Sequence, residues 1–196
     1  LSTSDSAHYN NQQHHHHSAP GAGPDATAVG SALARVPARA VATVLTALRC
    51  SIIELSSHAG AGHPAVALAS VQAAEAIASL VNDHHGWDEA AALAGSVSDA
   101  LGPAVAAARA GGMEALQGQL ACAWVSAQAT LAKLRLRRGE AAGAAGALEA
   151  CAAAATDLLG GMHSETMRVV AALANALEEA GDYASAAQQY GRVLCW

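Results

Sequence analysis

A short phrase of apolar and small residues that recurs three times is the feature that most constrains the fold of this chain. Its first part, Leu or Ile followed by Ala, recurs after 54 and then 42 residues, at Ile77–Ala78, Leu131–Ala132 and Leu173–Ala174. Its second part is an alanine that recurs at the same two intervals, at Ala90, Ala144 and Ala186. A recurrence on this scale is the sequence signature of stacked supersecondary units, each of which buries its apolar face against its neighbours.

This pattern resembles the tetratricopeptide repeat, a pair of antiparallel helices that approach closely where small residues of the two helices meet. Ala132 with Ala144, and Ala174 with Ala186, stand where the resemblance places those small residues. The segment Gly181–Asp182–Tyr183 is similar to the turn between the two helices of a repeat, with the tyrosine packing back against them.

The intervals are longer than the 34 residues usual for this family, and an interval of 42 residues is similar to that of kinesin light chain repeats. Those repeats carry a phrase similar to Leu-Gly-x-x-His-Pro between them, and residues 60–64 and 159–163 hold comparable phrases. The block 101–112 accounts for the difference between the two intervals. We expect this block to be either an insertion or a lengthening of one helix pair.

The resemblance, which covers about residues 40–196, implies an all-α fold: an α-solenoid of antiparallel helix pairs with about three repeats and a leading helix. Apolar residues at helical rather than alternating spacing favour the same class. Gly102–Pro103 is expected to end one helix, and the leading helix to be the second half of an earlier repeat. We expect helices over about 38–57, 64–82, 87–101, 113–138, 140–159, 165–180 and from 183 onward.

The apolar content of the chain comes mainly from alanine. Hydrophobic residues make up 53% of the sequence, yet phenylalanine is absent and aromatic residues make up 3%. Alanine has the highest helix propensity, but it buries little area per residue, so helices built from it must pack closely to gain stability. A stack of close-packed helices suits this composition.

The N-terminal part differs in composition from the rest. Asn10–His17 is a Gln/Asn/His run and Ala19–Pro24 is rich in Pro and Gly, so neither buries enough apolar area to offset chain entropy. We predict a disordered low-complexity segment over 1–36 and a tetratricopeptide-like helical repeat domain over 37–196. The histidines His14–His17 are interpreted as low complexity rather than a metal site, because no partner ligand accompanies them.

The two ends of the chain indicate a fragment of a longer protein. The sequence begins at Leu1 rather than Met and ends at Trp196 inside an apparent helix. Because the ends of solenoids need polar capping surfaces, we expect further repeats, or a partner in a larger assembly, to cover the last repeat.

Net charge and cysteine content limit which partners and which cellular compartment suit this chain. The formal net charge is −6, which opposes nucleic acid as the main partner because phosphate binding needs a basic stripe. Gly and polar residues interrupt every apolar run, so we expect none to reach the length needed to span a membrane. The four cysteines stand far apart in apolar helical stretches. This favours buried free thiols and a cytoplasmic location, with the nucleus as the alternative.

The sequence carries no catalytic pattern. It contains no G-x-S-x-G nucleophile elbow, no phosphate-binding glycine loop and no H-E-x-x-H motif. His84–His85 is a poor pair of metal ligands, because neighbouring residues of a helix point in different directions. We therefore predict no catalytic residue, no metal site, no cofactor and no enzymatic activity in this chain.

The resemblance places ligand binding in a concave groove lined by the first helix of each repeat. The physical model is an extended peptide held by polar side chains that project from a rigid surface. Each candidate is also compatible with an ordinary solvated surface. The candidate partner-binding residues are the polar residues of the expected first helices: Gln72, Glu75, Asn82, Lys133, Arg137, Arg168, Asn175 and Glu178.

Two functions from different classes fit these observations. The first is a protein–protein interaction scaffold that binds a peptide or a partner helix on the concave face. The alternative is the C-terminal helical lobe of a SET-and-MYND-domain lysine methyltransferase, which residues 131–139 resemble together with Ala144 and Leu148. The zinc-finger cysteines and the catalytic motif of that family are absent from this sequence.

Overall fold

The computed structural model describes residues 38–60, 63–80 and 84–195, with side chains from residue 43 onward except that of His84. The predicted disordered segment 1–36 and the candidate residue Asn82 lie outside this part of the chain. The described residues contain no strand, so the predicted all-α class is confirmed. The helices are α2 (Ala38–Ala59), α3 (Pro64–Leu80), α4 (His84–Ala110), α5 (Glu114–Arg137), α6 (Ala141–Leu159), α7 (Ser164–Glu179) and α8 (Tyr183–Leu194).

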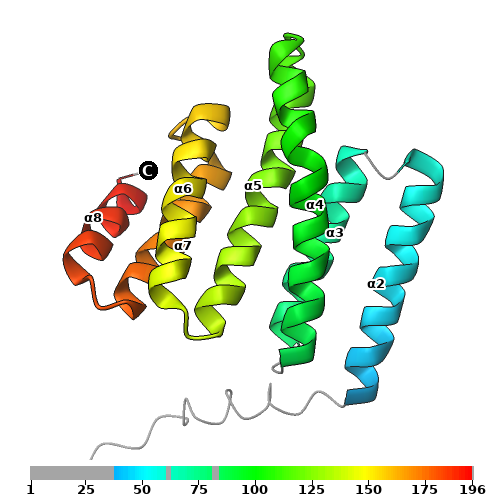
Figure 1. Cartoon of the computed structure of the whole chain (residues 1–196), viewed down its shortest axis with the longest axis horizontal. Coiled ribbons are helices and arrows are strands. Elements are labelled where there is room, and N and C mark those ends of the chain that lie inside the picture. Colours follow the sequence, from blue (N-terminus) through cyan, green and yellow to red (C-terminus); the bar gives the residue numbers. More distant parts are fainter. Residues whose placement is uncertain (1–37, 61–62, 81–83, 196) are drawn as a thin grey trace, which may run out of the picture. The chain divides into compact units, whose positions relative to one another are not determined.

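Consecutive helices pack side by side and run in opposite directions (Figure 1). We call α3, α5 and α7 the first helices of three pairs, and α4, α6 and α8 the second helices. The first helices also contact one another along the stack, α3 with α5 and α5 with α7. Within the described residues no such contact joins α4 to α6. This arrangement confirms the predicted α-solenoid of helix pairs preceded by the leading helix α2.

Small residues stand in the core where the helices of a pair meet. Ala132 and Ala144 belong to one buried cluster, together with Leu148. Ala78 and Ala90 belong to another. Because an alanine side chain adds little width to a helix, burial at these positions lets the paired backbones approach closely, as the tetratricopeptide resemblance implies.

The turn between α7 and α8 agrees with the prediction in its backbone but not in its tyrosine. Gly181 adopts a φ of 84°, which favours glycine. The carboxylate of Asp182 caps α8 by accepting a hydrogen bond from the backbone N–H of Ser185 at 3.1 Å. Tyr183 is the first residue of α8 and is 70% exposed. The expectation that Tyr183 packs back is therefore wrong, because its side chain lies largely in solvent.

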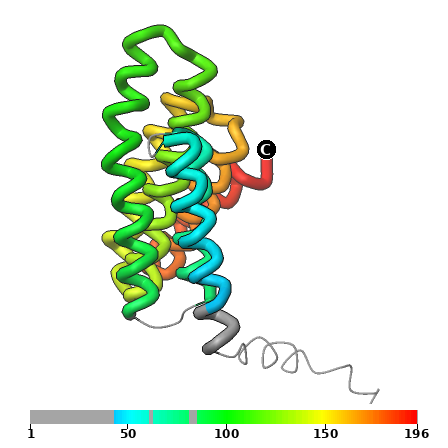
Figure 2. The backbone as a smooth tube through the Cα atoms, turned by 90° about the vertical axis from the view of Figure 1, so that its right-hand side faces the viewer, coloured from blue at the N-terminus to red at the C-terminus, as the bar shows by residue number. Residues whose placement is uncertain are grey.

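Helix α4 does not end at Gly102–Pro103 as expected but continues to Ala110. A proline inside a helix removes one backbone hydrogen bond and crowds the preceding turn. Burial on the same helix offsets this, because Leu101, Val105 and Ala108 all lie in one apolar cluster that includes residues of α5. The block 101–112 therefore lengthens α4, the second helix of the first pair, rather than forming a separate insertion. The turn that joins α4 to α5 extends past the neighbouring helix ends (Figure 2).

Two helices are long and apolar enough, by length and composition alone, to cross a membrane: residues His85–Ala110 of α4, and α6. The expectation that no apolar run reaches this length is therefore wrong. Alanine raises the hydropathy of both segments, and each packs between two other helices, α4 between α3 and α5, and α6 between α5 and α7. The core helices of a helical repeat pass the same test of length and composition.

The expected burial of all four cysteines is also wrong. Cys50 and Cys195 are exposed, Cys122 is partly buried and Cys151 is buried. Cys50 lies on α2, which packs on α3 through one face and leaves its other side chains largely outside the core. Apolar neighbours in the sequence therefore do not bury a cysteine when the helix itself has few packing partners.

Candidate binding groove on the first helices

A groove of about 430 Å³ runs across the first helices and brings together most of the predicted binding residues. Its apolar walls include Ala78, Leu134 and Ala172. Five of the eight candidates line it, from three different helices: Glu75 on α3, Lys133 and Arg137 on α5, and Arg168 and Asn175 on α7. The side chains of each helix converge because residues three, four or seven positions apart share one face.

Two further candidates among the described residues, Gln72 and Glu178, lie apart from this groove. Gln72 is exposed on α3 and is not a lining residue. Glu178, near the end of α7, accepts a hydrogen bond from the hydroxyl of Tyr190 at 2.8 Å. The same hydroxyl lies 2.5 Å from Oδ1 of Asn175, so α8 holds these two polar side chains of α7. The bond to Glu178 raises the pKa of Tyr190 because it stabilises the protonated phenol.

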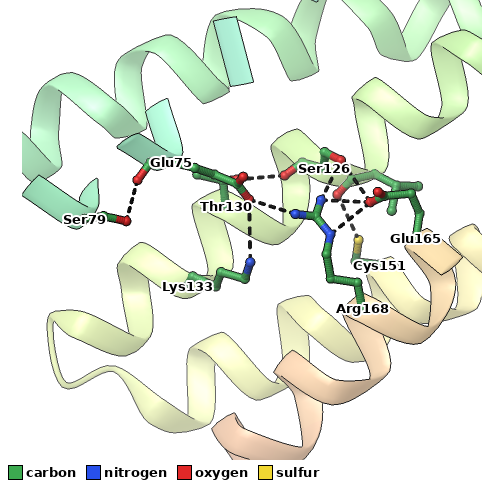
Figure 3. A network of polar contacts seen from close by, with 9 residues as sticks. Glu75, Ser79, Ser126, Thr130, Lys133, Cys151, Glu165 and Arg168 are labelled. Atoms are coloured by element: carbon green, nitrogen blue, oxygen red, sulfur yellow. Dashed lines mark hydrogen bonds and ion pairs between the residues drawn. The ribbon is translucent and has the colours of Figure 1, made fainter. Parts of the chain in front are cut away.

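One carboxylate oxygen of Glu75 is the centre of the polar contacts in the groove (Figure 3). Its Oε1 accepts a hydrogen bond from Nη1 of Arg168 at 3.1 Å and lies 3.6 Å from Nζ of Lys133. The hydroxyl of Thr130 lies 3.3 Å from the same oxygen and donates to the nearer backbone carbonyl of Ser126 at 2.9 Å. A single acidic side chain of α3 is thus joined to α5 and to α7, and the contact to Arg168 spans 93 residues of sequence.

The guanidinium of Arg168 is held on its other edge as well. Its Nε and Nη2 donate to Oε2 of Glu165 at 3.1 and 2.8 Å. Its Nη2 also donates to the hydroxyl of Ser126 at 2.7 Å, and that hydroxyl lies 3.1 Å from the same Glu165 oxygen. Charge-assisted bonds of this kind fix both the position and the plane of a guanidinium.

Glu165 is itself placed by the start of α7. His163 precedes that helix, and its Nδ1 accepts a hydrogen bond from the backbone N–H of Glu165 at 3.2 Å. His63 does the same at the start of α3, where it accepts from the backbone N–H of Ala65 at 3.2 Å. The two histidines are 100 residues apart in sequence and cap two of the three first helices in the same way.

Arg137 lies at the end of the groove where α3 terminates. Its Nη1 donates to the backbone carbonyl of Ala78, in the last turn of α3. Carbonyls in the last turn of a helix have no partner within the helix, and a cation there also meets the negative end of the helix dipole. Arg137 therefore has both a structural contact and a place on the groove wall.

The candidates chosen from the sequence did not include three residues of this network: Ser126, Thr130 and Glu165. Ser126 and Thr130 are buried polar residues. Serine and threonine are common inside helices, so neither residue by itself indicates a binding site. The repeat interval does point to Ser126, because this residue stands 42 residues before Arg168 and so holds the equivalent position in the preceding repeat. Aligning the repeats would have placed Gln72, Ser126 and Arg168 in one row across the first helices.

Comparison with known proteins finds similar solved structures of helical repeats. Two crystal structures, one of them of a single-residue variant, show a Podosopora anserina putative kinesin light chain with nearly identical TPR-like repeats; each is 16% identical to this chain. Each match covers 80% of this chain and 86% of the other, with a TM-score of 0.36. No protein-family model matches the sequence, and no curated protein matches it. The description of this chain as a tetratricopeptide-like helical repeat rests on its own helix pairs.

Proposed function

We propose that this helical repeat is a protein-interaction scaffold that binds an extended, acidic segment of a partner protein in the groove on α3, α5 and α7. The observation that carries the proposal is the convergence of five polar side chains from three first helices on one groove. A rigid row of helices presents such side chains at fixed spacing, so a peptide can be held at several points without ordering the binding surface.

The charge of the groove supports an acidic ligand. Lys133, Arg137 and Arg168 line it, and Glu75 is the one acidic residue among the described residues of its wall. This local excess of positive charge occurs in a chain whose formal net charge is −6. Carboxylates of a ligand would form charge-assisted hydrogen bonds to these cations, and the apolar walls provide contact area for the other side chains.

A charge-reversal experiment tests the proposal. The full 196-residue chain would be compared with the double variant Lys133→Glu and Arg137→Glu in affinity capture from cell extract, read by quantitative mass spectrometry. Arg168 is left intact because its contacts with Glu75, Ser126 and Glu165 join three elements. We expect a set of captured proteins to be lost from the groove variant, and acidic segments of those proteins to bind the unchanged chain after purification.

The matched control is the double variant Arg135→Glu and Arg192→Glu. Both arginines are exposed and neither lines the groove, so the control changes the net charge by the same amount. Partners that are lost from both variants respond to net charge alone. If the groove variant retains every partner that the unchanged chain captures, the groove is not the binding surface and the proposal is wrong.

The alternative function, a helical lobe of a SET-and-MYND-domain methyltransferase, stays a prediction. No contact among the described residues favours it over the scaffold. Binding of S-adenosylmethionine by the isolated chain, measured by calorimetry, would support it. The cytoplasmic or nuclear location likewise stays a prediction.

A further inference from the structure

We propose that Glu75 is an internal competitor for acidic ligands in this groove and thereby sets which acidic segments can bind. This inference rests on the proposed function and adds a specificity-determining residue to it. Glu75 is the one groove-lining acid of the described wall, and its carboxylate already occupies the position that the carboxylate of a ligand would take.

Arg168 presents one open edge to the groove. Its Nε and Nη2 are engaged by Glu165 and Ser126, from the α7 and α5 side. The remaining nitrogen, Nη1, is the one that donates to Glu75 at 3.1 Å. A ligand carboxylate that approaches Arg168 from the groove therefore meets the nitrogen that Glu75 already uses.

Lys133 is shared in the same way. Its Nζ lies 3.6 Å from Oε1 of Glu75, the same oxygen that accepts from Arg168. These three side chains are each about one-third exposed: 31% for Glu75, 40% for Lys133 and 37% for Arg168. They are therefore accessible to a ligand without any opening of the core, and Glu75 neutralises part of the charge of both cations.

Two consequences follow for ligand choice. A single carboxylate gains little by replacing Glu75, because it exchanges one ion pair for another of the same kind. A segment with several acidic residues can engage Lys133 and Arg168 in place of Glu75 while its other carboxylates reach Arg137 and the far end of the groove. Glu75 thus selects for multiply acidic segments and against isolated acidic residues.

The test uses a defined probe, a fluorescein-labelled peptide of six glutamates, and fluorescence anisotropy with the full chain. The variants are Glu75→Gln and, as a control with the same change in net charge, Glu149→Gln. Glu149 is exposed on α6 and does not line the groove. Exposed ion pairs contribute only modest free energies, so we expect Glu75→Gln to bind the probe about fivefold tighter than either the unchanged chain or the control. The affinity of this variant should also fall more steeply with added salt.

A third variant tests whether Lys133 accounts for the gain in affinity. Adding Lys133→Gln to Glu75→Gln should return the affinity to that of the unchanged chain or below it, because one of the two released cations is removed. Circular dichroism and thermal midpoints of all variants establish that the comparison is between folded proteins.

Each outcome decides the inference. If Glu75→Gln and Glu149→Gln bind the probe equally, Glu75 is not a competitor, while the proposed groove stands. Weaker binding by Glu75→Gln would mean that Glu75 positions Arg168 for ligands, and would overturn the inference. If no variant binds the probe, releasing the cations does not create an acidic-peptide site and the inference is wrong. In that case the capture experiment with Lys133→Glu and Arg137→Glu still judges the scaffold function separately.

Discussion

Nη2 of Arg168 donates a hydrogen bond to the hydroxyl of Ser126 at 2.7 Å, and the two residues hold equivalent positions in neighbouring repeats, 42 residues apart. Arg168 on α7 therefore contacts the residue at the equivalent position of α5. Its Nη1 also donates a hydrogen bond to Glu75 on α3, on the other side of α5. Since α3 and α7 are not neighbours in the stack, this side chain links the first and the third helix pair across the second.

Removing Arg168 is expected to weaken all three pairs rather than one. In Arg168→Met the stem is kept, but Glu75 loses one cation and Glu165 loses the guanidinium held at 2.8 Å. Since these groups are partly exposed, water compensates in part, and we expect the free energy of unfolding to fall by about 1 to 2 kcal/mol. Urea denaturation measures the change. Arg192→Met, at an exposed position of α8, is the comparison and should change stability by less than about 0.5 kcal/mol.

The helices were largely predictable because strong local signals mark their ends. Gly139, Gly160 and Gly181 follow or precede apolar helical stretches, and each adopts a positive φ that glycine allows at no steric cost. The exception at Gly102–Pro103 has a physical reason. A residue that disfavours helix formation is tolerated inside a helix when the residues around it are buried. Here Leu101 and Val105 lie in the core, and their burial stabilises the continuous helix.

The candidate site was predictable in part. Helical spacing and the resemblance indicate which face of α3, α5 and α7 is polar, and this brought Glu75, Lys133 and Arg168 onto one candidate surface. The contact between Glu75 and Arg168 could not be predicted, because it depends on how far α7 is shifted relative to α3 across the intervening α5. That shift is set by side-chain packing between helices rather than by any local pattern.

Enlarging a small residue at a helix crossing tests the close packing of each pair. In Ala144→Leu three carbon atoms are added at a position with no exposed surface, beside Ala132 and Leu148 in the same cluster. Overpacking should lower the free energy of unfolding by about 1 to 3 kcal/mol. The matched variant is Ala142→Leu, on the exposed side of the same helix, where we expect almost no change. Equal effects in the two variants, measured by denaturant titration, would show that α5 and α6 are not closely packed at Ala144.

Replacing the proline inside α4 should stabilise the protein. Pro103→Ala restores one backbone N–H to the helix and removes the crowding of the preceding turn. The side chain is exposed, so little packing is lost. The unfolded chain gains conformational entropy when proline is replaced, which offsets part of the effect, and the net gain in unfolding free energy should be about 1 to 2 kcal/mol. Pro64→Ala is the control, because Pro64 is the first residue of α3, where a missing N–H costs nothing. A loss of stability in Pro103→Ala would contradict a continuous α4.

The histidine that precedes α7 should contribute to stability as a helix cap. In His163→Ala the backbone N–H of Glu165 loses its acceptor, and we expect a loss of about 1 kcal/mol in the free energy of unfolding. His163→Asn offers a side-chain oxygen at the same position and should restore most of that loss. If alanine and asparagine behave alike in thermal denaturation, the contact from Nδ1 does not hold the start of α7.

Burial of Cys151 should make stability depend on alkaline pH. Desolvation in the core raises the pKa of this thiol from 9.0 to about 11, although the charge of Arg168 acts in the opposite direction. In the unfolded chain the thiol ionises near pH 9, so below that pH the folded state loses nothing. As the pH rises from about 9 to about 11, the unfolded state releases the proton first and the free energy of unfolding falls. Urea titrations of the unchanged chain and of Cys151→Ala across this range measure the effect, and the pH-dependent part should be smaller in the variant. Identical pH profiles would show that Cys151 ionises equally in the folded and the unfolded state.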